Sequence, residues 1–291
     1  MGLPRHGSKD VLLTGASGAI GTAIARRLAK AGFRLHLTSR DSKKLTGLQK
    51  EFSKSPPVLY TLDLQNLDEA RGVVDQFFKN AEHPFALICN AGDLGVLGRF
   101  LDTDFNTWHE SLNQNFLAHA AMIHAFGLRF VSGNIDEGSV VVLSGAGLGG
   151  PVTPNLSSYG TSKAALTYLV EALAAEWSPH HLTINSVAPG QVKSGITEQA
   201  LRAGADRVGV YAESARKCME SGGVSPDLAA QLIEFLLSPA ARGVSGRLLS
   251  ARFDQKRLRE DTEAVAQNKH LYRLRRIDED LFGSCKAELK S

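Results

Sequence analysis

Short apolar runs alternate with helical patterns along most of the chain. Six runs of four or five residues are nearly all apolar and predict strands at 10–14, 35–38, 58–62, 85–89, 139–143 and 183–187. Helical patterns lie between them, most clearly at 108–130 and 159–177. Apolar strands separated by helices indicate a parallel sheet covered on both faces. Because parallel crossovers are right-handed, we expect a doubly wound, Rossmann-type α/β fold.

The chain reads as one domain with an extension. No linker rich in proline or serine divides residues 10–250, so we expect a single Rossmann domain over 8–251. Residues 252–291 carry many charges of both signs and few glycines. They predict one or two solvated helices packed outside the domain. A flap over the substrate cleft and an arm on a neighbouring subunit are the alternatives.

Composition and charge exclude several classes of protein. The net charge is only +3, with basic residues interleaved among acidic ones, so no nucleic-acid partner is expected. No apolar stretch approaches the roughly 20 residues that span a bilayer, and the first ten residues lack a signal core. The cysteines fit neither zinc spacing nor a disulfide framework. The adjacent His180 and His181 would not converge on one ion. We expect a soluble, cytoplasmic protein without a metal.

A glycine-rich segment follows the first expected strand. It reads TGASGAIG from Thr14 to Gly21, and a helical pattern follows it. Glycines there let a pyrophosphate approach the backbone, and the helix N-terminus offers free N–H groups and a favourable dipole. A plain β-α turn is the alternative, but the position between strand and helix fits a dinucleotide site. The expected cofactor contacts are Gly15, Ser17, Gly18, Ala19, Ile20 and Gly21.

The end of the second expected strand bears on the choice of cofactor. A carboxylate there would bind the ribose 2′-hydroxyl of NAD, but the chain reads Ser39-Arg40-Asp41. An arginine suits a 2′-phosphate through a charge-assisted forked contact. We therefore favour NADP(H), with NAD(H) possible if Asp41 turns inward. Further cofactor contacts are expected from Ser39, Asp63, Leu64, Asn90, Ala91 and Gly92.

Tyr159 and Lys163 are the expected reacting groups. Their spacing of four places them on one face of a helix. A free phenol, with a pKa of about 10, is a poor acid or base near neutral pH. A neighbouring ammonium together with an oxidised nicotinamide ring would draw that pKa towards the working range. The pair therefore predicts proton transfer coupled to hydride transfer by the cofactor.

Taken together, these motifs resemble the short-chain dehydrogenase/reductase superfamily over roughly residues 9–250. The carrying segments are TGASGAIG, the Asp63-Leu64 pair, CNAG at 89–92, YGTSK at 159–163 and NSVAPGQVKS at 185–194. The resemblance implies an oxidoreductase that interconverts a secondary alcohol and a ketone, with Tyr159 as acid/base and Lys163 also gripping the ribose. It also implies a homodimer or homotetramer formed through the helices 108–130 and 159–177.

The resemblance implies further site residues. Asn115 matches, better than Asn113, the helix asparagine that holds a water in the proton relay. The loop that packs on the nicotinamide is matched by Pro189, Gly190, Val192 and Ser194.

The glycine loop departs from the compact branch of the superfamily. Ala19 stands where that branch has its middle glycine, and Gly18 comes one position early. The loop therefore spells TGxxGxxG, the fingerprint of the extended branch, which acts on nucleotide sugars. The CNAG motif, the PGQV loop and the lack of room for an extended substrate domain favour the compact branch.

The serine that usually holds the substrate oxygen is displaced. The family places it 13 residues before the active tyrosine, which reaches Ala146, whereas counting along the fifth strand reaches Gly145. We expect the neighbouring Ser144 to take this role. The alternatives are Ser157, Ser158 and a backbone amide.

The substrate is expected to be a small carbonyl or alcohol, selected by residues 195–223. That segment mixes apolar and basic residues and names no substrate. A rival interpretation is a cofactor-binding sensor or scaffold of the same fold with little chemistry. The displaced serine supports the rival, and the intact Tyr159, Lys163 and Asn115 argue against it.

Overall fold

The computed structural model describes residues 9–53, 55–145, 148 and 152–276. In this part of the chain, parallel strands form one sheet in the order β3-β2-β1-β4-β5-β6-β7. Their bounds are Asp10–Leu13 (β1), Arg34–Ser39 (β2), Val58–Thr61 (β3), Pro84–Cys89 (β4), Gly138–Leu143 (β5), Leu182–Ala188 (β6) and Leu248–Ser250 (β7). The strand order reverses between β1 and β4, which confirms the expected doubly wound Rossmann-type fold.

Helices connect the strands. They are Ala19–Lys30 (α1), Ser42–Gln49 (α2), Leu67–Asn80 (α3), Phe105–Leu112 (α4), Ala118–Ser132 (α5), Ser157–Glu176 (α6), Gly195–Ala203 (α7), Ala205–Val208 (α8), Tyr211–Ser221 (α9), Pro226–Leu236 (α10), Gln255–Glu260 (α11) and Thr262–Gln267 (α12). Short 3-10 turns cover Lys50–Phe52, Phe100–Asp102, Ser178–His180 and Pro239–Ala241. In the described residues, no helix is long and apolar enough to cross a membrane.

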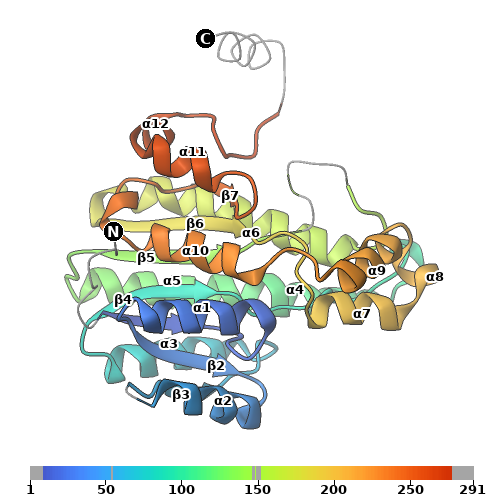
Figure 1. Cartoon of the computed structure of the whole chain (residues 1–291), viewed down its shortest axis with the longest axis horizontal. Helices are drawn as coiled ribbons and strands as arrows, with labels where there is room; N and C mark the ends of the chain where they lie inside the picture. Colours follow the sequence, from blue (N-terminus) through green and yellow to red (C-terminus); the bar gives the residue numbers. More distant parts are fainter. Residues whose placement is uncertain (1–8, 54, 146–147, 149–151, 277–291) are drawn as a thin grey trace.

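The apolar strands bury side chains on both faces of the sheet. In β5, Val141 and Leu143 join the core under α1 and α10, while Val140 and Val142 join the core under α3, α5 and α6. This alternation follows from the two-residue repeat of a strand. It explains why the runs are apolar throughout. The lid, which we define as α7, α8 and α9, lies together at one end of the molecule (Figure 1).

The expected helix over 108–130 is interrupted. Residues Asn113–Leu117 form a π-helical turn between α4 and α5. Such a turn adds a residue to the helical repeat and is often found at functional sites. Here it contains Asn115, which is fully buried.

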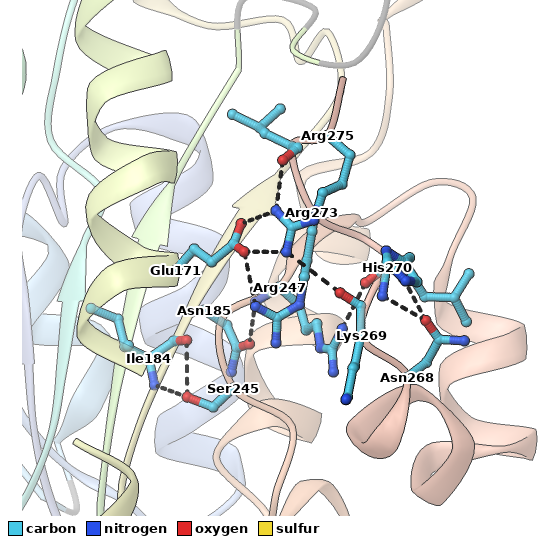
Figure 2. Close-up of polar contacts among 12 residues, drawn as sticks. Glu171, Ile184, Asn185, Ser245, Arg247, Asn268, Lys269, His270, Arg273 and Arg275 are labelled. Atoms are coloured by element: carbon cyan, nitrogen blue, oxygen red, sulfur yellow. Dashed lines mark hydrogen bonds and ion pairs between the residues drawn. The ribbon is translucent and has the colours of Figure 1, made fainter. Parts of the chain in front are cut away.

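The described part of the C-terminal extension is held by arginines. Arg247, only 2% exposed, donates to the carbonyl oxygens of Leu271 (2.8 Å) and Ala266 (2.9 Å). Arg273 and Arg275 both pair with Glu171 of α6, as Figure 2 shows. The helices α11 and α12 lie beyond β7 and pack on the core under α1 and α10. The expected outer helices are therefore present up to residue 276. The domain boundary at 251/252 stays a prediction, and 277–291 lie outside the described residues.

A buried polar chain links the first three strands at their amino ends. His36 Nε2 lies 2.9 Å from Asp10 Oδ1, and His36 Nδ1 lies 2.9 Å from Tyr60 Oη. Asn80 donates to the same hydroxyl at 3.2 Å. Asp10 and His36 are at most 1% exposed, so each polar atom here depends on its protein partners.

We predict that Tyr60→Phe lowers the free energy of unfolding by about 1–3 kcal/mol, because it leaves the buried His36 Nδ1 without its hydrogen-bond partner and removes the acceptor of Asn80. Urea unfolding followed by circular dichroism measures the change. Tyr168→Phe is the matched control, because Tyr168 is 73% exposed, and it should stay within about 0.5 kcal/mol. Equal effects of the two variants would show that the buried chain adds no stability.

Candidate active site

The glycine loop, residues 14–18, packs tightly against the end of β4. Gly15 has a φ of +64°, and a Cβ atom there would lie 2.8 Å from Ala91 Cα. A Cβ atom on Gly21, in the first turn of α1, would lie 2.2 Å from the carbonyl oxygen of Gly15. Only glycine fits at either position. The first N–H groups of α1 therefore stand at the loop with no intrahelical partner, as at any helix start.

Thr14 and Asn90 join the ends of β1 and β4. Asn90 Nδ2 donates to the carbonyl oxygens of Thr14 (2.9 Å) and Gly15 (3.1 Å). In return, Thr14 Oγ1 accepts hydrogen bonds from the backbone N–H groups of Asn90 (2.9 Å) and Ala91 (3.0 Å). Asn90 thus fixes the shape of the glycine loop from the side.

A cleft of about 750 Å³ opens at the carboxyl ends of β1, β2 and β4. Its lining includes the expected cofactor contacts Gly15, Ser17, Gly18, Ala19, Ile20, Gly21, Ser39, Arg40, Leu64, Asn90, Ala91, Gly92 and Ser194. Outside that lining are Asp63, Tyr159, Lys163, Pro189, Gly190 and Val192. Asp63 instead accepts a hydrogen bond from Gln65 N at an exposed turn, and Val192 is buried in a bridge with Gly223.

The charged end of the cleft lies where β2 meets α2. The carboxylate of Asp41 caps α2, with Oδ1 accepting from Lys44 N at 3.0 Å. Ser39 Oγ lies 2.7 Å from Ser17 Oγ and accepts from Asp41 N at 3.1 Å. Arg40 is exposed and lines the cleft. Lys44, which the sequence did not predict as a site residue, lines it too. Two cations and two hydroxyls therefore meet at this end, and the nearby carboxylate is engaged by its own helix.

Tyr159 and Lys163 lie on one face of α6, as their spacing predicts. Lys163 is 4% exposed and donates from Nζ to the carbonyl oxygen of Leu143 at 2.8 Å. Its Nζ lies 5.7 Å from the centre of the Tyr159 ring. Burial lowers the pKa of Lys163 to about 8, although the charges of Cys89 and Asp93 oppose this. Burial also raises the pKa of Tyr159, with Tyr211 and Asp93 adding to the effect.

Asn115 stands beside Lys163. A Cβ atom on Gly92 would lie 2.8 Å from Asn115 Oδ1 and 3.8 Å from Lys163 Nζ, so both side chains reach the same point. Asn115 Oδ1 accepts from Asp93 N at 3.1 Å. Its Nδ2 is buried and has no partner among the described residues. Tyr159, Lys163 and Asn115 therefore form one cluster.

Ser144 lies outside this cluster. Its hydroxyl is buried and lies 3.1 Å from Thr167 Oγ1, one helical turn beyond Lys163. The residue that faces Tyr159 is Gly145, where a Cβ atom would lie 2.8 Å from Tyr159 Oη. Ser144 is therefore not placed as the sequence predicts, at the substrate oxygen. Successive side chains of a strand point to opposite faces, and the side chain of Ser144, which directly follows β5, lies under α6. Ala146 lies outside the described residues.

The alternative hydroxyls are also engaged. Ser157 Oγ accepts from Trp108 Nε1 at 3.0 Å, and Ser158 Oγ donates to the carbonyl oxygen of Val96 at 3.3 Å. The structure brings no described serine of this region to Tyr159 Oη.

A residue that the sequence did not predict, Gln199, joins the lid to the loop after β4. Gln199 of α7 accepts from Leu94 N at 3.0 Å, while its Nε2 lies 3.4 Å from the Gly95 carbonyl oxygen. Gln199 carries no motif, so the sequence offered no signal for it. Among the described residues, no group of His, Cys, Asp and Glu side chains could hold a metal ion.

The chain was compared with protein families and with known proteins. A family model described as short chain dehydrogenase matches residues 9–204. The 3-oxoacyl-[acyl-carrier-protein] reductase of Rickettsia conorii is 32% identical over 197 residues, which cover 66% of this chain and 76% of the relative. Galactitol 2-dehydrogenase (L-tagatose-forming) of Cereibacter sphaeroides is 27% identical over 241 residues, covering 82% and 91%.

Solved structures agree with this grouping. A short chain dehydrogenase from Burkholderia cenocepacia in complex with NADP has a TM-score of 0.72 and 25% identity, covering 84% of this chain and 97% of the other. An actinorhodin polyketide ketoreductase with NADPH has a TM-score of 0.74 and 23% identity, covering 84% and 95%. The second likeness concerns the fold alone.

We predict that Gly21→Ala destabilises the protein by about 1–3 kcal/mol, because its Cβ must push the loop away from α1. The helix propensity of alanine, worth about 1 kcal/mol over glycine, does not offset a contact of 2.2 Å. Gly18→Ser is the control, since a Cβ there would lie 3.5 Å from the Gly15 carbonyl oxygen, an ordinary contact. Thermal unfolding compares the two variants. A Gly21→Ala protein as stable as the control would contradict the close packing described.

Proposed function

Because the chain belongs to the short-chain dehydrogenase family and is an NAD(P)-dependent oxidoreductase, we propose that it uses NADP(H) to interconvert a secondary alcohol and a ketone. Tyr159 is the acid/base in this proposal. The observation that carries it is the single cluster of Tyr159, Lys163 and Asn115 beside the cleft. The substrate is a small carbonyl or alcohol, and a cytoplasmic homodimer or homotetramer stays a prediction of the sequence.

The residues present fit a dinucleotide. Gly15 and Gly21 leave the backbone bare where a pyrophosphate would approach, and the start of α1 supplies N–H donors and a positive dipole. Gly18 caps this helix without a side chain that would intrude on an anion. When bound, the nicotinamide supplies or accepts the hydride. Pro189, Gly190, Val192 and Ser194 are the proposed wall on which its ring packs.

The choice of NADP(H) rests on the end of β2. A 2′-phosphate needs cations, and Arg40 and Lys44 both stand at the cleft. Recognition of NAD would need a carboxylate that is free to bind the ribose 2′-hydroxyl. The carboxylate of Asp41 instead accepts a hydrogen bond from the backbone of the first turn of α2. The similar short chain dehydrogenase from Burkholderia cenocepacia, solved in complex with NADP, adds support.

Proton movement follows from the burial of the cluster. Burial raises the pKa of Tyr159, so its hydroxyl is protonated at neutral pH and ready to donate to a carbonyl oxygen in the reducing direction. Lys163, with a pKa of about 8, is mostly charged at pH 7. Its ammonium stabilises the phenolate left behind. Asn115, whose buried Nδ2 is free for a polar partner, is proposed to connect the pair to the proton that restores Tyr159.

A second candidate function is a cofactor-binding sensor or scaffold. Gly145 favours it, because a glycine faces Tyr159 where the family usually has a serine. Titrating the protein with NADPH by fluorescence and then assaying a panel of carbonyl compounds separates the two. Tight binding with no turnover of any carbonyl would support the sensor.

We predict that Tyr159→Phe lowers kcat by at least about 100-fold, the usual contribution of a positioned acid or base. NADPH affinity should change little, because the lost hydroxyl does not line the cleft. NADPH oxidation with the best carbonyl of the panel measures kcat, and fluorescence titration measures affinity. Turnover close to that of the unaltered enzyme would remove Tyr159 from the mechanism.

We predict that Arg40→Ala weakens NADPH binding by about 10–100-fold, since a charge-assisted contact is worth about 1.5–3 kcal/mol. NADH binding should stay within about twofold. Arg71→Ala is the control, because Arg71 is exposed on α3, lies outside the lining of the cleft and pairs with Asp68 of the same helix. Both cofactors are titrated against each variant. Equal losses for NADPH and NADH would rule out a 2′-phosphate contact at Arg40.

A further inference from the structure

In the proposed reaction, the substrate oxygen needs a second hydrogen-bond donor beside Tyr159. Among the described residues that follow β5, no side chain supplies this donor. Gly145 has no side chain, and Ser144, Ser157 and Ser158 use their hydroxyls elsewhere. Two donors at the oxygen are worth far more than one, because charge grows there as hydride arrives. The lid is the remaining structure beside Tyr159.

The lid brings a second phenol to the same place. A small apolar cluster joins the loop after β4, the start of α6 and the lid; its buried members are Leu94, Leu97, Leu156, Ala200, Val208, Ala212 and Ala215. The rings of Tyr159 and Tyr211 both pack against it. Tyr211 is the first residue of α9. The two phenols therefore pack against one apolar cluster that joins the lid to the start of α6.

Gln191 contacts the first turn of α9, the helix that begins with Tyr211. Its Oε1 accepts from Ser214 Oγ at 2.7 Å, which fixes the amide under the first turn of α9. Its backbone carbonyl accepts from Val224 N at 2.9 Å, which fixes the residue itself. Gln191 Nε2 is buried without a hydrogen-bond partner among the described residues. This leaves one buried donor to be satisfied.

The electrostatics agree with this arrangement. Burial raises the pKa of Tyr211, and the amide of Gln191 beside the hydroxyl opposes that rise. After burial, Tyr211 is the largest cause of the raised pKa of Tyr159.

We propose that Tyr211, oriented by Gln191, donates the second hydrogen bond to the substrate oxygen in place of the side chain that Gly145 lacks. This rests on the proposed function. In the proposed substrate complex, Gln191 Nε2, which has no partner among the described residues, turns to donate to Tyr211 Oη, and the Tyr211 hydroxyl donates a hydrogen bond to the substrate oxygen. Tyr159 remains the group that transfers a proton.

The apolar cluster also indicates a class of substrate. Leu94, Leu156 and Val208 belong to the cluster against which both phenols pack, and these residues are at most 3% exposed. A carbonyl flanked by apolar groups fits such surroundings, since its carbon skeleton meets only apolar side chains. We therefore take cyclohexanone, 2-octanone and acetophenone as probes.

The test compares Tyr211→Phe, Gln191→Leu and the double variant in NADPH-dependent reduction of these ketones. We expect Tyr211→Phe to lower kcat by about 100-fold, as loss of one donor to a developing oxyanion does. Gln191→Leu should lower it by less. The double variant should be no slower than Tyr211→Phe alone, because both changes remove one contact. NADPH affinity should stay within twofold, and the exposed Tyr168→Phe should behave as the unaltered enzyme.

The possible failures are distinguishable. If Tyr159→Phe is inactive while Tyr211→Phe turns over at the unaltered rate, the anchor is wrong and the proposed function stands. If losses at Tyr211 and Gln191 simply multiply, the two residues do not act through one contact and the proposal is wrong. An unaltered enzyme that binds NADPH but reduces no probe overturns the proposed function and the anchor with it. If Tyr211→Phe does not fold, as judged by circular dichroism, Gln191→Leu alone decides: unchanged kcat overturns the anchor.

Discussion

The glycine loop approaches the end of β4 so closely that a single added Cβ atom on Gly15 would lie 2.8 Å from Ala91 Cα. That approach places the start of α1, the amide of Asn90 and the bare backbone of Gly92 around one point. From there the same constraint extends inward, because Gly92 leaves the space in which Asn115 and Lys163 meet. The cleft and the cluster of Tyr159, Lys163 and Asn115, to which we assign cofactor binding and proton transfer, therefore both depend on one close contact between β1 and β4.

Burial then sets the chemistry of that cluster. It disfavours charge on both members, lowering the pKa of Lys163 to about 8 and raising that of Tyr159. In the free protein the phenol is thus held protonated, and ionisation becomes favourable only with added positive charge nearby. An oxidised nicotinamide ring would supply that charge. In the proposed mechanism, Tyr159 would therefore act as a base only with the oxidised cofactor, which would tie the direction of proton transfer to that of hydride transfer.

Patterns that repeat were predictable from the sequence, and single contacts were not. Five of the six longer strands are almost wholly buried, and their apolar runs mark their positions; β3, at the edge of the sheet, is partly exposed but still reads as an apolar run. β7 has three residues and includes no such run, and the π-helical turn at Asn113–Leu117 leaves the apolar spacing almost unchanged. Tyr159 and Lys163 could be paired by their spacing. Ser144 could not be placed, because a one-residue difference in a loop decides which side of β5 a hydroxyl faces. Gln199 and Gln191 act through contacts that no spacing encodes.

The C-terminal extension shows why a charged segment is hard to interpret from sequence. Arg247 is among the most buried large side chains of the described chain, although arginine is almost never fully buried unless it is paired. It is buried because the extension wraps around it: carbonyl oxygens of Ala266 and Leu271 receive its guanidinium, and Glu171 holds Arg273 and Arg275 on either side (Figure 2). Leu248 N of the edge strand β7 donates to the carbonyl oxygen of Tyr272 at 2.7 Å. An edge strand with its backbone satisfied in this way has less to offer a neighbouring sheet. Continuation of the sheet by a neighbouring strand is therefore disfavoured at the β7 edge.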